Sequence, residues 1–312
     1  MKSWFKTFVA SCAVVPFAAC ALTPGNVAFA QEAAVAAAPP VTTVAAKPGM
    51  WAVKDADTTI YLFGTVHVLK PGLGWFDGAV KQAFDKSDEL VLEMVMPEDQ
   101  AEAAKATMPL AMDKSGTALS AKLDPDALTA YQAALTGLGV PANAFDAFKP
   151  WFAAITLSVL PLTKLGYDPT QGAEMQLTAA AKTAAKPISG FETPEEQLGF
   201  FDSIPEEGQI AFLNATVKDI DKLAPTLDTM VGQWSKGDTD NLAATMNESM
   251  AATPELTHIL LWDRNARWAD QIKARMDKPG TVFVAVGAGH LAGQKSVQDY
   301  LKERGLKVTR VQ

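Results

Sequence analysis

Short apolar runs rich in β-branched and aromatic residues recur along the chain, and most end at a glycine or a charged residue. The clearest two are T-T-I-Y-L-F, which stops at Gly64, and T-V-F-V-A-V, which stops at Gly287. Runs of this length and composition are typical of buried β-strands. The predicted strands cover residues 58–63, 89–93, 186–191, 281–286 and 307–311.

The segments between these runs have helical patterns. Helices are predicted over 77–86, 173–185, 256–276 and 294–304, the last ending before Gly305 in the position of a C′ glycine. The stretches 97–169 and 193–250 also have helical patterns with few strand signals, and we interpret them as helical elaborations that form a cap. Strands that alternate with helices indicate an α/β fold with a mainly parallel or mixed sheet covered by helices.

Residues 1–30 have the pattern of a secretory signal peptide. Two lysines precede the uncharged apolar run 8–21, and Ala28-Phe29-Ala30 matches the small-residue cleavage pattern. We therefore expect cleavage after Ala30 and release into the periplasm. The alternative is a lipoprotein anchored through Cys20.

The next segment, 31–48, is rich in Ala, Pro, Val and Thr and is predicted to be a flexible tether. The remaining residues, 49–312, form one predicted α/β domain. The longest apolar stretch in this part, 151–162, is too short to cross a bilayer, so no membrane span is expected in the mature chain.

Loss of the signal segment changes the charge and the available chemistry. It removes two of 27 basic residues and no acidic ones, which leaves 25 basic against 35 acidic residues and a net charge of −10. Such a chain, without a basic stripe, is not expected to bind nucleic acid or an anionic membrane surface. Cys12 and Cys20 both lie in the segment, so the mature chain has no thiol and a metal would need histidine and carboxylate ligands.

Two of the three histidines follow a predicted strand at the same spacing. His67 comes three residues after Gly64, and His290 comes three residues after Gly287. Glycine permits a sharp turn and a close approach of the backbone. Because ligands of open α/β sheets bind at the carboxyl edge of the strands, we expect both histidines to meet there, although more than two hundred residues separate them.

Carboxylates end two of the other predicted strands. Glu93 closes the second strand and is expected at the same edge, where it can be a metal ligand or a general base. Two histidines and one carboxylate leave coordination positions for water and substrate and suit Mn, Co, Zn or Fe. Glu192 follows the third strand, directly before Thr193 and Glu196, which have capping-box spacing.

The predicted helix 256–276 carries one further candidate for the site. Arg264 is a candidate to stabilise negative charge that develops during a reaction. His258 lies six residues before it on the same helix, and an ordinary surface or core role is expected for it.

The chain resembles the TraB/GumN family, which is related to the Tiki metalloproteases. The matching motifs, in chain order, are Y-L-F-G-T-V-H (61–67), L-V-L-E (90–93), G-A-E-M-Q-L (172–177), K-P-I-S-G-F-E-T-P-E-E-Q (186–197), W-S-K-G-D (234–238), R-N-A-R-W-A (264–269) and F-V-A-V-G-A-G-H-L-A-G (283–293). The resemblance implies an α/β fold similar to the erythromycin-esterase and ChaN-like group. For the Tiki branch it also implies a metal-dependent protease or peptidase.

The resemblance assigns roles to residues at matching positions. It places the metal on His67, Glu93 and His290, with Gly64 and Gly287 shaping the two turns. Glu192 and Arg264 also match family positions and are expected to be catalytic, Glu192 as a further metal ligand or the proton carrier. Glu174 lies where the family usually has an acidic residue and is expected to support the site.

These observations predict a periplasmic metal-dependent hydrolase that acts on a peptide or small-molecule substrate. One alternative is a metal-free, esterase-like hydrolase in which a histidine activates water. The other is a non-catalytic protein that binds a peptide, a pheromone or a haem-like ligand.

Overall fold

A computed structural model describes residues 43–250 and 254–312, and the expected signal segment lies outside these residues. Its centre is a six-stranded mixed sheet with the strand order β6-β5-β7-β3-β2-β8. The strands are β2 (Met50–Lys54), β3 (Thr58–Thr65), β5 (Glu89–Met94), β6 (Ile188–Glu192), β7 (Gly280–Gly287) and β8 (Val308–Arg310). The α/β class and the mixed sheet expected from the sequence are confirmed.

Four neighbouring strands of the sheet, β6, β5, β7 and β3, run parallel, and β2 runs antiparallel to its two neighbours. Thr65 pairs with Gly287, and Met94 pairs with Glu192, so the four parallel strands end at one edge. Strands predicted to stop before the two glycines continue through them, because β3 and β7 pair residue for residue to their ends. Every functional side chain that the sequence placed after a strand therefore emerges at this edge.

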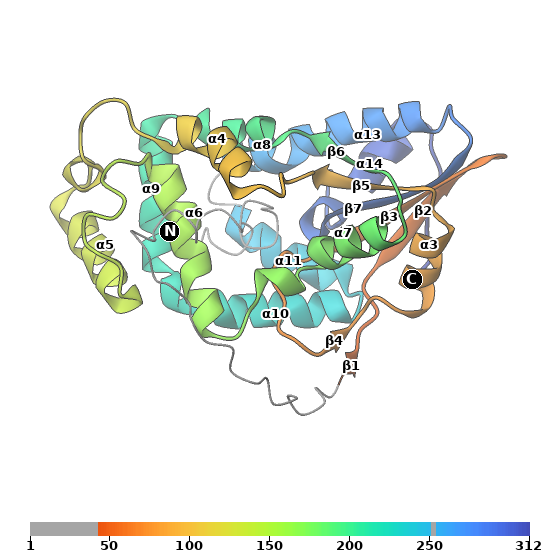
Figure 1. Cartoon of the computed structure of the whole chain (residues 1–312), viewed down its shortest axis with the longest axis horizontal. Helices are drawn as coiled ribbons and strands as arrows, with labels where there is room; N and C mark the ends of the chain where they lie inside the picture. Colours follow the sequence, from red (N-terminus) through yellow and green to blue (C-terminus); the bar gives the residue numbers. More distant parts are fainter. Residues whose placement is uncertain (1–42, 251–253) are drawn as a thin grey trace.

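Helices cover both faces of the sheet (Figure 1). One face packs against α3 (Gly78–Lys86), α7 (Ala173–Thr183), α10 (Leu223–Ser235) and α11 (Thr239–Met250). The other packs against α13 (Asp263–Arg275) and α14 (Val297–Glu303). The alternating strand pattern explains both layers, since Phe283 faces the first core and Val282 and Val284 face the second.

A helical lobe extends beyond the sheet, at the left of Figure 1, and has its own core. It consists of α4 (Gln100–Ala111), α5 (Pro125–Leu138), α6 (Pro150–Lys164), α8 (Pro194–Asp202) and α9 (Glu206–Lys218). The apolar stretch 151–162 lies in α6, where Trp151 and Phe152 are buried against the other helices. No helix among the described residues has the length and apolar character that a membrane crossing requires.

The segment before the sheet is partly structured. Val44–Ala45 form β1, which pairs in parallel with β4 (Leu73–Gly74), and Ala46 is buried in the core. The last part of the expected tether therefore packs on the domain, and residues 31–42 lie outside the described part of the chain. Neither β1, β2 nor β4 was predicted, because their short sequences acquire strand geometry only from a pairing partner.

The helix predicted over 256–276 contains a change of pitch. It starts as α12 (Pro254–Thr257), widens into a π-helical turn over His258–Trp262, and continues as α13. A π-turn holds one extra residue, which rotates the following helix by about 100° relative to an unbroken α-helix. That rotation decides which side chains of α13 face the edge of the sheet.

Short 3₁₀ turns complete the fold at η1 (Leu119–Lys122), η2 (Pro169–Gln171), η3 (Ile220–Lys222) and η5 (Ala288–Leu291). The capping box predicted at the start of α8 is present, with Thr193 and Glu196 bonded to each other's backbone N–H.

Candidate functional site

Two turns carry the histidines of the site. The first turn follows β3 and leads to His67, and the second follows β7 and leads to His290. The two turns lie in contact. A Cβ atom added to Gly64 would lie 3.1 Å from the Cα atom of Ala288. Gly64 is not among the residues with positive φ, and Gly287 has a φ of −50°. The first glycine is therefore needed for close approach of the two turns rather than for a left-handed backbone.

Helix α7 is docked directly on the first turn. A Cβ atom on Gly172, the residue before α7, would lie 2.2 Å from the carbonyl oxygen of His67. The N–H of Ala173 also donates to the carbonyl of Val66 at 3.0 Å. This docking brings Glu174, in the first turn of the helix, beside the His67 ring.

His67 is buried, and only one of its ring nitrogens has a partner. Its Nδ1 lies 2.7 Å from Glu174 Oε1, which also accepts a hydrogen bond from the Thr65 hydroxyl. A carboxylate can only accept, so Nδ1 carries the proton, and Nε2 is buried without a hydrogen-bond partner. Burial opposes the charged ring, but the charge and hydrogen bond of Glu174, with a contribution from Glu93, raise the pKa of His67.

His290 is fully buried on the second turn, and its Nδ1, like that of His67, faces an oxygen acceptor. Its Nδ1 lies 2.6 Å from Asn265 Oδ1, and its Nε2 lies 3.7 Å from Glu93 Oε1. The ring centre of Trp268 is 4.3 Å away. Burial, reinforced by the nearby Arg264 guanidinium, lowers the pKa of His290 to about 3 despite the opposing effect of Glu93, so the ring is neutral at physiological pH.

Arg264 joins the two predicted carboxylates. Its Nη2 lies 2.7 Å from both Glu93 Oε2 and Glu192 Oε2, and its Nε lies 2.9 Å from Glu192 Oε1. All three side chains are buried. Burial alone would raise the pKa of Glu93, but the Arg264 guanidinium and the N–H of Gly287 hold it at about 2.

The remaining hydrogen bonds of the carboxylates come from three donors, and the half-exposed Arg267 places its Nη2 3.6 Å from Glu192 Oε1. Gly287 N donates to Glu93 Oε1 at 2.7 Å, and Trp268 Nε1 donates to Glu192 Oε1 at 3.1 Å. The Gln197 amide spans both groups, at 3.1 Å from Glu93 Oε2 and 3.3 Å from Glu192 Oε2. Glu192 therefore has both oxygens engaged within the protein.

The structure thus brings all six predicted side chains to the carboxyl edge of the sheet: His67, Glu93, Glu174, Glu192, Arg264 and His290. His258 lies apart from them, with half of its side chain exposed and its ring 4.5 Å from that of Trp262. This matches the ordinary surface role expected for it.

Four further residues of the site were not predicted: Thr65, Gln197, Asn265 and Trp268. Trp268 lies four residues after Arg264 and three after Asn265, spacings at which side chains of a helix are neighbours. That spacing within R-N-A-R-W-A was a usable signal. Gln197 ends the motif 186–197, but the sequence pattern gave it no role.

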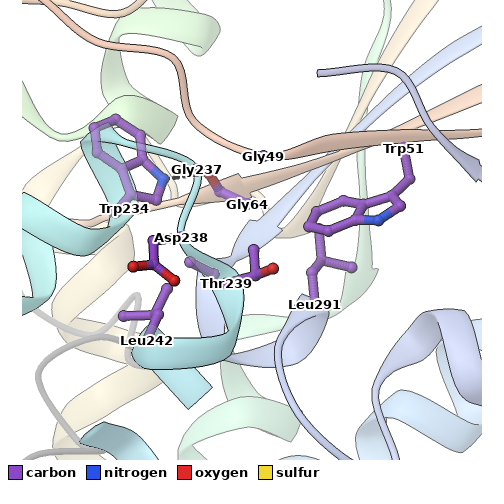
Figure 2. A pocket seen from close by; sticks show the side chains of 10 residues that line it. Gly49, Trp51, Gly64, Trp234, Gly237, Asp238, Thr239, Leu242 and Leu291 are labelled. Atoms are coloured by element: carbon purple, nitrogen blue, oxygen red, sulfur yellow. Dashed lines mark hydrogen bonds between the residues drawn. The ribbon is translucent and has the colours of Figure 1, made fainter. Parts of the chain in front are cut away.

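The W-S-K-G-D segment, residues 234–238, contacts the backbone at the end of β3, just before the first turn. Figure 2 shows the pocket that it lines together with Gly64 and Leu291, which holds about 230 Å³ of empty space, part of it open to solvent. Trp234 Nε1 donates to the carbonyl of Gly64 at 2.7 Å. Gly237 has a φ of +66°, and a Cβ atom there would lie 2.8 Å from the carbonyl oxygen of Lys47. The motif thus fixes the backbone that leads to His67.

The donor chemistry of the site fits a divalent cation. In both imidazoles Nδ1 is held by an oxygen acceptor, which leaves Nε2 as the nitrogen available to a ligand, and His290 Nε2 also lies 3.4 Å from Arg264 Nη1. Glu93 Oε1 is the carboxylate oxygen nearest to His290 Nε2. Within 43–250 and 254–312, no three histidine or acidic side chains already stand at ligand distance of one point. The donor types match those of such a cation, but these side chains would have to move closer together to ligate one.

Comparison with known proteins agrees with the extent of the domain. The family model described as the TraB/PrgY/gumN family matches residues 49–310. The chain is 25% identical over 242 residues to the uncharacterized protein YbaP of Escherichia coli (strain K12), covering 78% of this chain and 87% of YbaP. An uncharacterized protein of Treponema pallidum (strain Nichols) is 22% identical over 276 residues, covering 82% of this chain and 80% of that protein.

No solved structure matches the chain significantly. The family model spans the sheet, both Gly-x-x-His turns and the whole helical lobe. The chain therefore belongs to the TraB/PrgY/gumN family.

Proposed function

We propose that the protein is a periplasmic metal-dependent hydrolase that cleaves peptides. The observation that carries the proposal is the state of the two histidines. Each has its Nδ1–H held by an oxygen acceptor, and His67 Nε2 is buried with no hydrogen-bond partner among the described residues. Leaving a buried nitrogen unpaired costs free energy, and a ligand at this atom would offset that cost.

The charges around the histidines favour a cation. Glu93 and Glu192 face the buried guanidinium of Arg264, the half-exposed Arg267 lies 3.6 Å from Glu192, and Glu174 pairs with His67. His290 stays neutral because its pKa is about 3, so it adds no positive charge. In the buried part of the site two carboxylates therefore share one guanidinium, and a divalent cation would balance the remaining negative charge.

His67, His290 and Glu93 are the residues that would hold the metal, which is Mn, Co, Zn or Fe by donor type. When bound, such a cation polarises a scissile carbonyl and lowers the pKa of a bound water. Arg264 and Gln197 orient Glu93 from the side opposite to Gly287, and Glu192 keeps Arg264 in place. Because two carboxylates already share its charge, we assign Arg264 to charge balance rather than to the oxyanion role expected from the sequence.

The first test is elemental analysis of the mature protein, purified without a His tag. We expect one stoichiometric divalent metal in the wild type and its loss in His67→Ala and His290→Ala. His258→Ala is the matched control, because this histidine is exposed and its loss should change nothing. A wild type that takes up no metal from a mixture of Mn, Co, Zn and Fe salts contradicts the proposal.

The second test is turnover of a peptide library, with and without a chelator. Cleavage that stops with chelator and returns with metal supports a metallopeptidase. Retention of peptides without cleavage would instead support the binding function.

One observation favours a metal-free hydrolase as the second candidate. The buried His67 pairs with the partly buried Glu174, and this contact raises the pKa of His67, as is typical of a histidine that removes a proton from water. A metal-free hydrolase of this kind would be consistent with the proposed similarity of the fold to the erythromycin-esterase and ChaN-like group. Hydrolysis that persists in chelator but is lost in Glu174→Gln would select it.

A further inference from the structure

We infer that Asn265 is a positioning residue that locks the His290 ring in the tautomer with the proton on Nδ1. The contact is short, with 2.6 Å between His290 Nδ1 and Asn265 Oδ1, and neither side chain is exposed. The lock determines which nitrogen of His290 is offered to a ligand or to a proton. It deepens the proposed function, in which His290 Nε2 is the working atom.

The direction of the Asn265 amide is fixed by its second contact. Its Nδ2 lies 2.8 Å from the carbonyl oxygen of Lys295. A backbone carbonyl only accepts, so the NH₂ group faces Lys295 and the amide oxygen faces His290. An amide oxygen also only accepts, so His290 Nδ1 is the donor and its Nε2 is left with the lone pair.

The backbone at Lys295 is built for this contact. Lys295 is one of two non-glycine residues with positive φ among those described, at +54°. The next residue, Ser296, caps α14 by accepting from the N–H of Asp299 at 3.3 Å. This cap helps to hold Lys295 in its unfavourable positive-φ conformation. In that conformation the carbonyl of Lys295 points at Asn265 and orients its amide.

The surroundings of Nε2 contain one group that favours its protonation and one that opposes it. Glu93 Oε1 lies 3.7 Å from His290 Nε2, so a small turn of the ring would give a proton on Nε2 a carboxylate partner. Arg264 Nη1, which can only donate, lies 3.4 Å from the same nitrogen and favours its lone pair. The Asn265 contact at 2.6 Å is much shorter than either and therefore makes the largest contribution to the tautomer.

The test reads the tautomer directly from ¹⁵N NMR of the imidazole nitrogens in chelator-treated protein. The chain has only three histidines, so His67→Ala and His258→Ala complete the assignment. We expect a protonated Nδ1 and an unprotonated Nε2 for His290 in the wild type. In Asn265→Ala we expect the Nε2-protonated form to appear.

Two variants make the test specific. Gln298→Ala is the matched control, because it removes a buried amide bond to the carbonyl of Leu291, beside His290, without touching the ring. It should leave the tautomer unchanged. Asn265→Asp keeps an acceptor for Nδ1 but loses the donor to the Lys295 carbonyl, so a protonated Nδ1 in this variant would show that the acceptor at this position sets the tautomer. If the alanine variant does not fold, the spectrum of the wild type still decides the inference.

A second readout is the affinity for Co²⁺, used as the probe. Loss of a residue that orients a histidine ligand lowers metal affinity roughly 10- to 100-fold, and we expect this for Asn265→Ala but not for Gln298→Ala. An unchanged tautomer in Asn265→Ala, or a protonated Nε2 in the wild type, overturns the inference. A wild type with the expected tautomer that binds no metal would contradict the proposed function and leave the lock standing.

Discussion

The guanidinium of Arg264 and the carboxylate of Glu93 lie 2.7 Å apart, although 171 residues separate them and both are buried. The pair connects α13 to the end of β5. Removal of one partner leaves the other charged and unpaired in the interior, which is the costly way to break a buried ion pair.

Replacement of Arg264 by leucine tests this pair. Both Glu93 and Glu192 lose their cation, so we expect the free energy of unfolding at neutral pH to fall by about 3–5 kcal/mol. Urea unfolding measures the change. The exposed pair of Lys81 and Asp85 is the control, since Lys81→Leu should cost less than about 1 kcal/mol. Equal costs at the two sites would contradict the assigned role.

The contribution of the Trp234–Gly64 hydrogen bond to stability can be measured separately from the contribution of indole packing. Trp234→Phe loses ring volume and the donor to the Gly64 carbonyl, whereas Trp75→Phe loses ring volume from an indole whose Nε1 has no partner. The two rings lie in one core, 6.1 Å apart. We expect Trp234→Phe to cost about 1–3 kcal/mol more, because the buried carbonyl is left unpaired. Thermal and urea unfolding of both variants give the comparison.

Gly172→Ala should disturb the first turn. Its Cβ would lie 2.2 Å from the His67 carbonyl oxygen, so α7 must move away and take Glu174 with it. We expect a loss of about 1–3 kcal/mol in the free energy of unfolding, as for other overpacked sites. Gly199→Ala, within α8 and with open space at the Cβ position, should instead gain about 0.5–1 kcal/mol. If both variants were stabilised, the proposed docking of α7 on the turn would be wrong.

The helical lobe has an acid-sensitive contact of its own. Lys122 Nζ lies 2.5 Å from Asp113 Oδ2, both side chains are largely buried, and the hydrogen bond from Lys122 lowers the pKa of Asp113 from 3.8 to about 2. Because the folded pKa is below the unfolded value, this stabilisation is complete above about pH 4. It is lost as the pH falls toward 2.

Asp113→Asn removes the acid-dependent part of that contact. Above pH 4 the variant should be less stable by roughly 2 kcal/mol, and the difference should shrink to near zero at pH 2. Urea midpoints measured from pH 2 to 7 test this. A gap that stays constant over the whole range would show that the carboxylate charge is not responsible.

The sequence by itself determined the parts that rest on local patterns. Strand composition and the glycine spacing placed His67 and His290 directly after two strands, and the parallel sheet then delivers them with Glu93 to one edge. The capping box at Thr193 was equally readable, because its bonds join residues three apart.

Only the tertiary structure decided how these residues are connected. A helical pattern does not say which strand a helix covers, so the contacts of Arg264 with two carboxylates could not be derived from it. Asn265 and Gln197 gain their roles from chain segments distant in sequence. The physical reason is that period and turn chemistry are properties of a few adjacent residues, whereas the partner of a buried polar group is chosen by the packing of the whole domain.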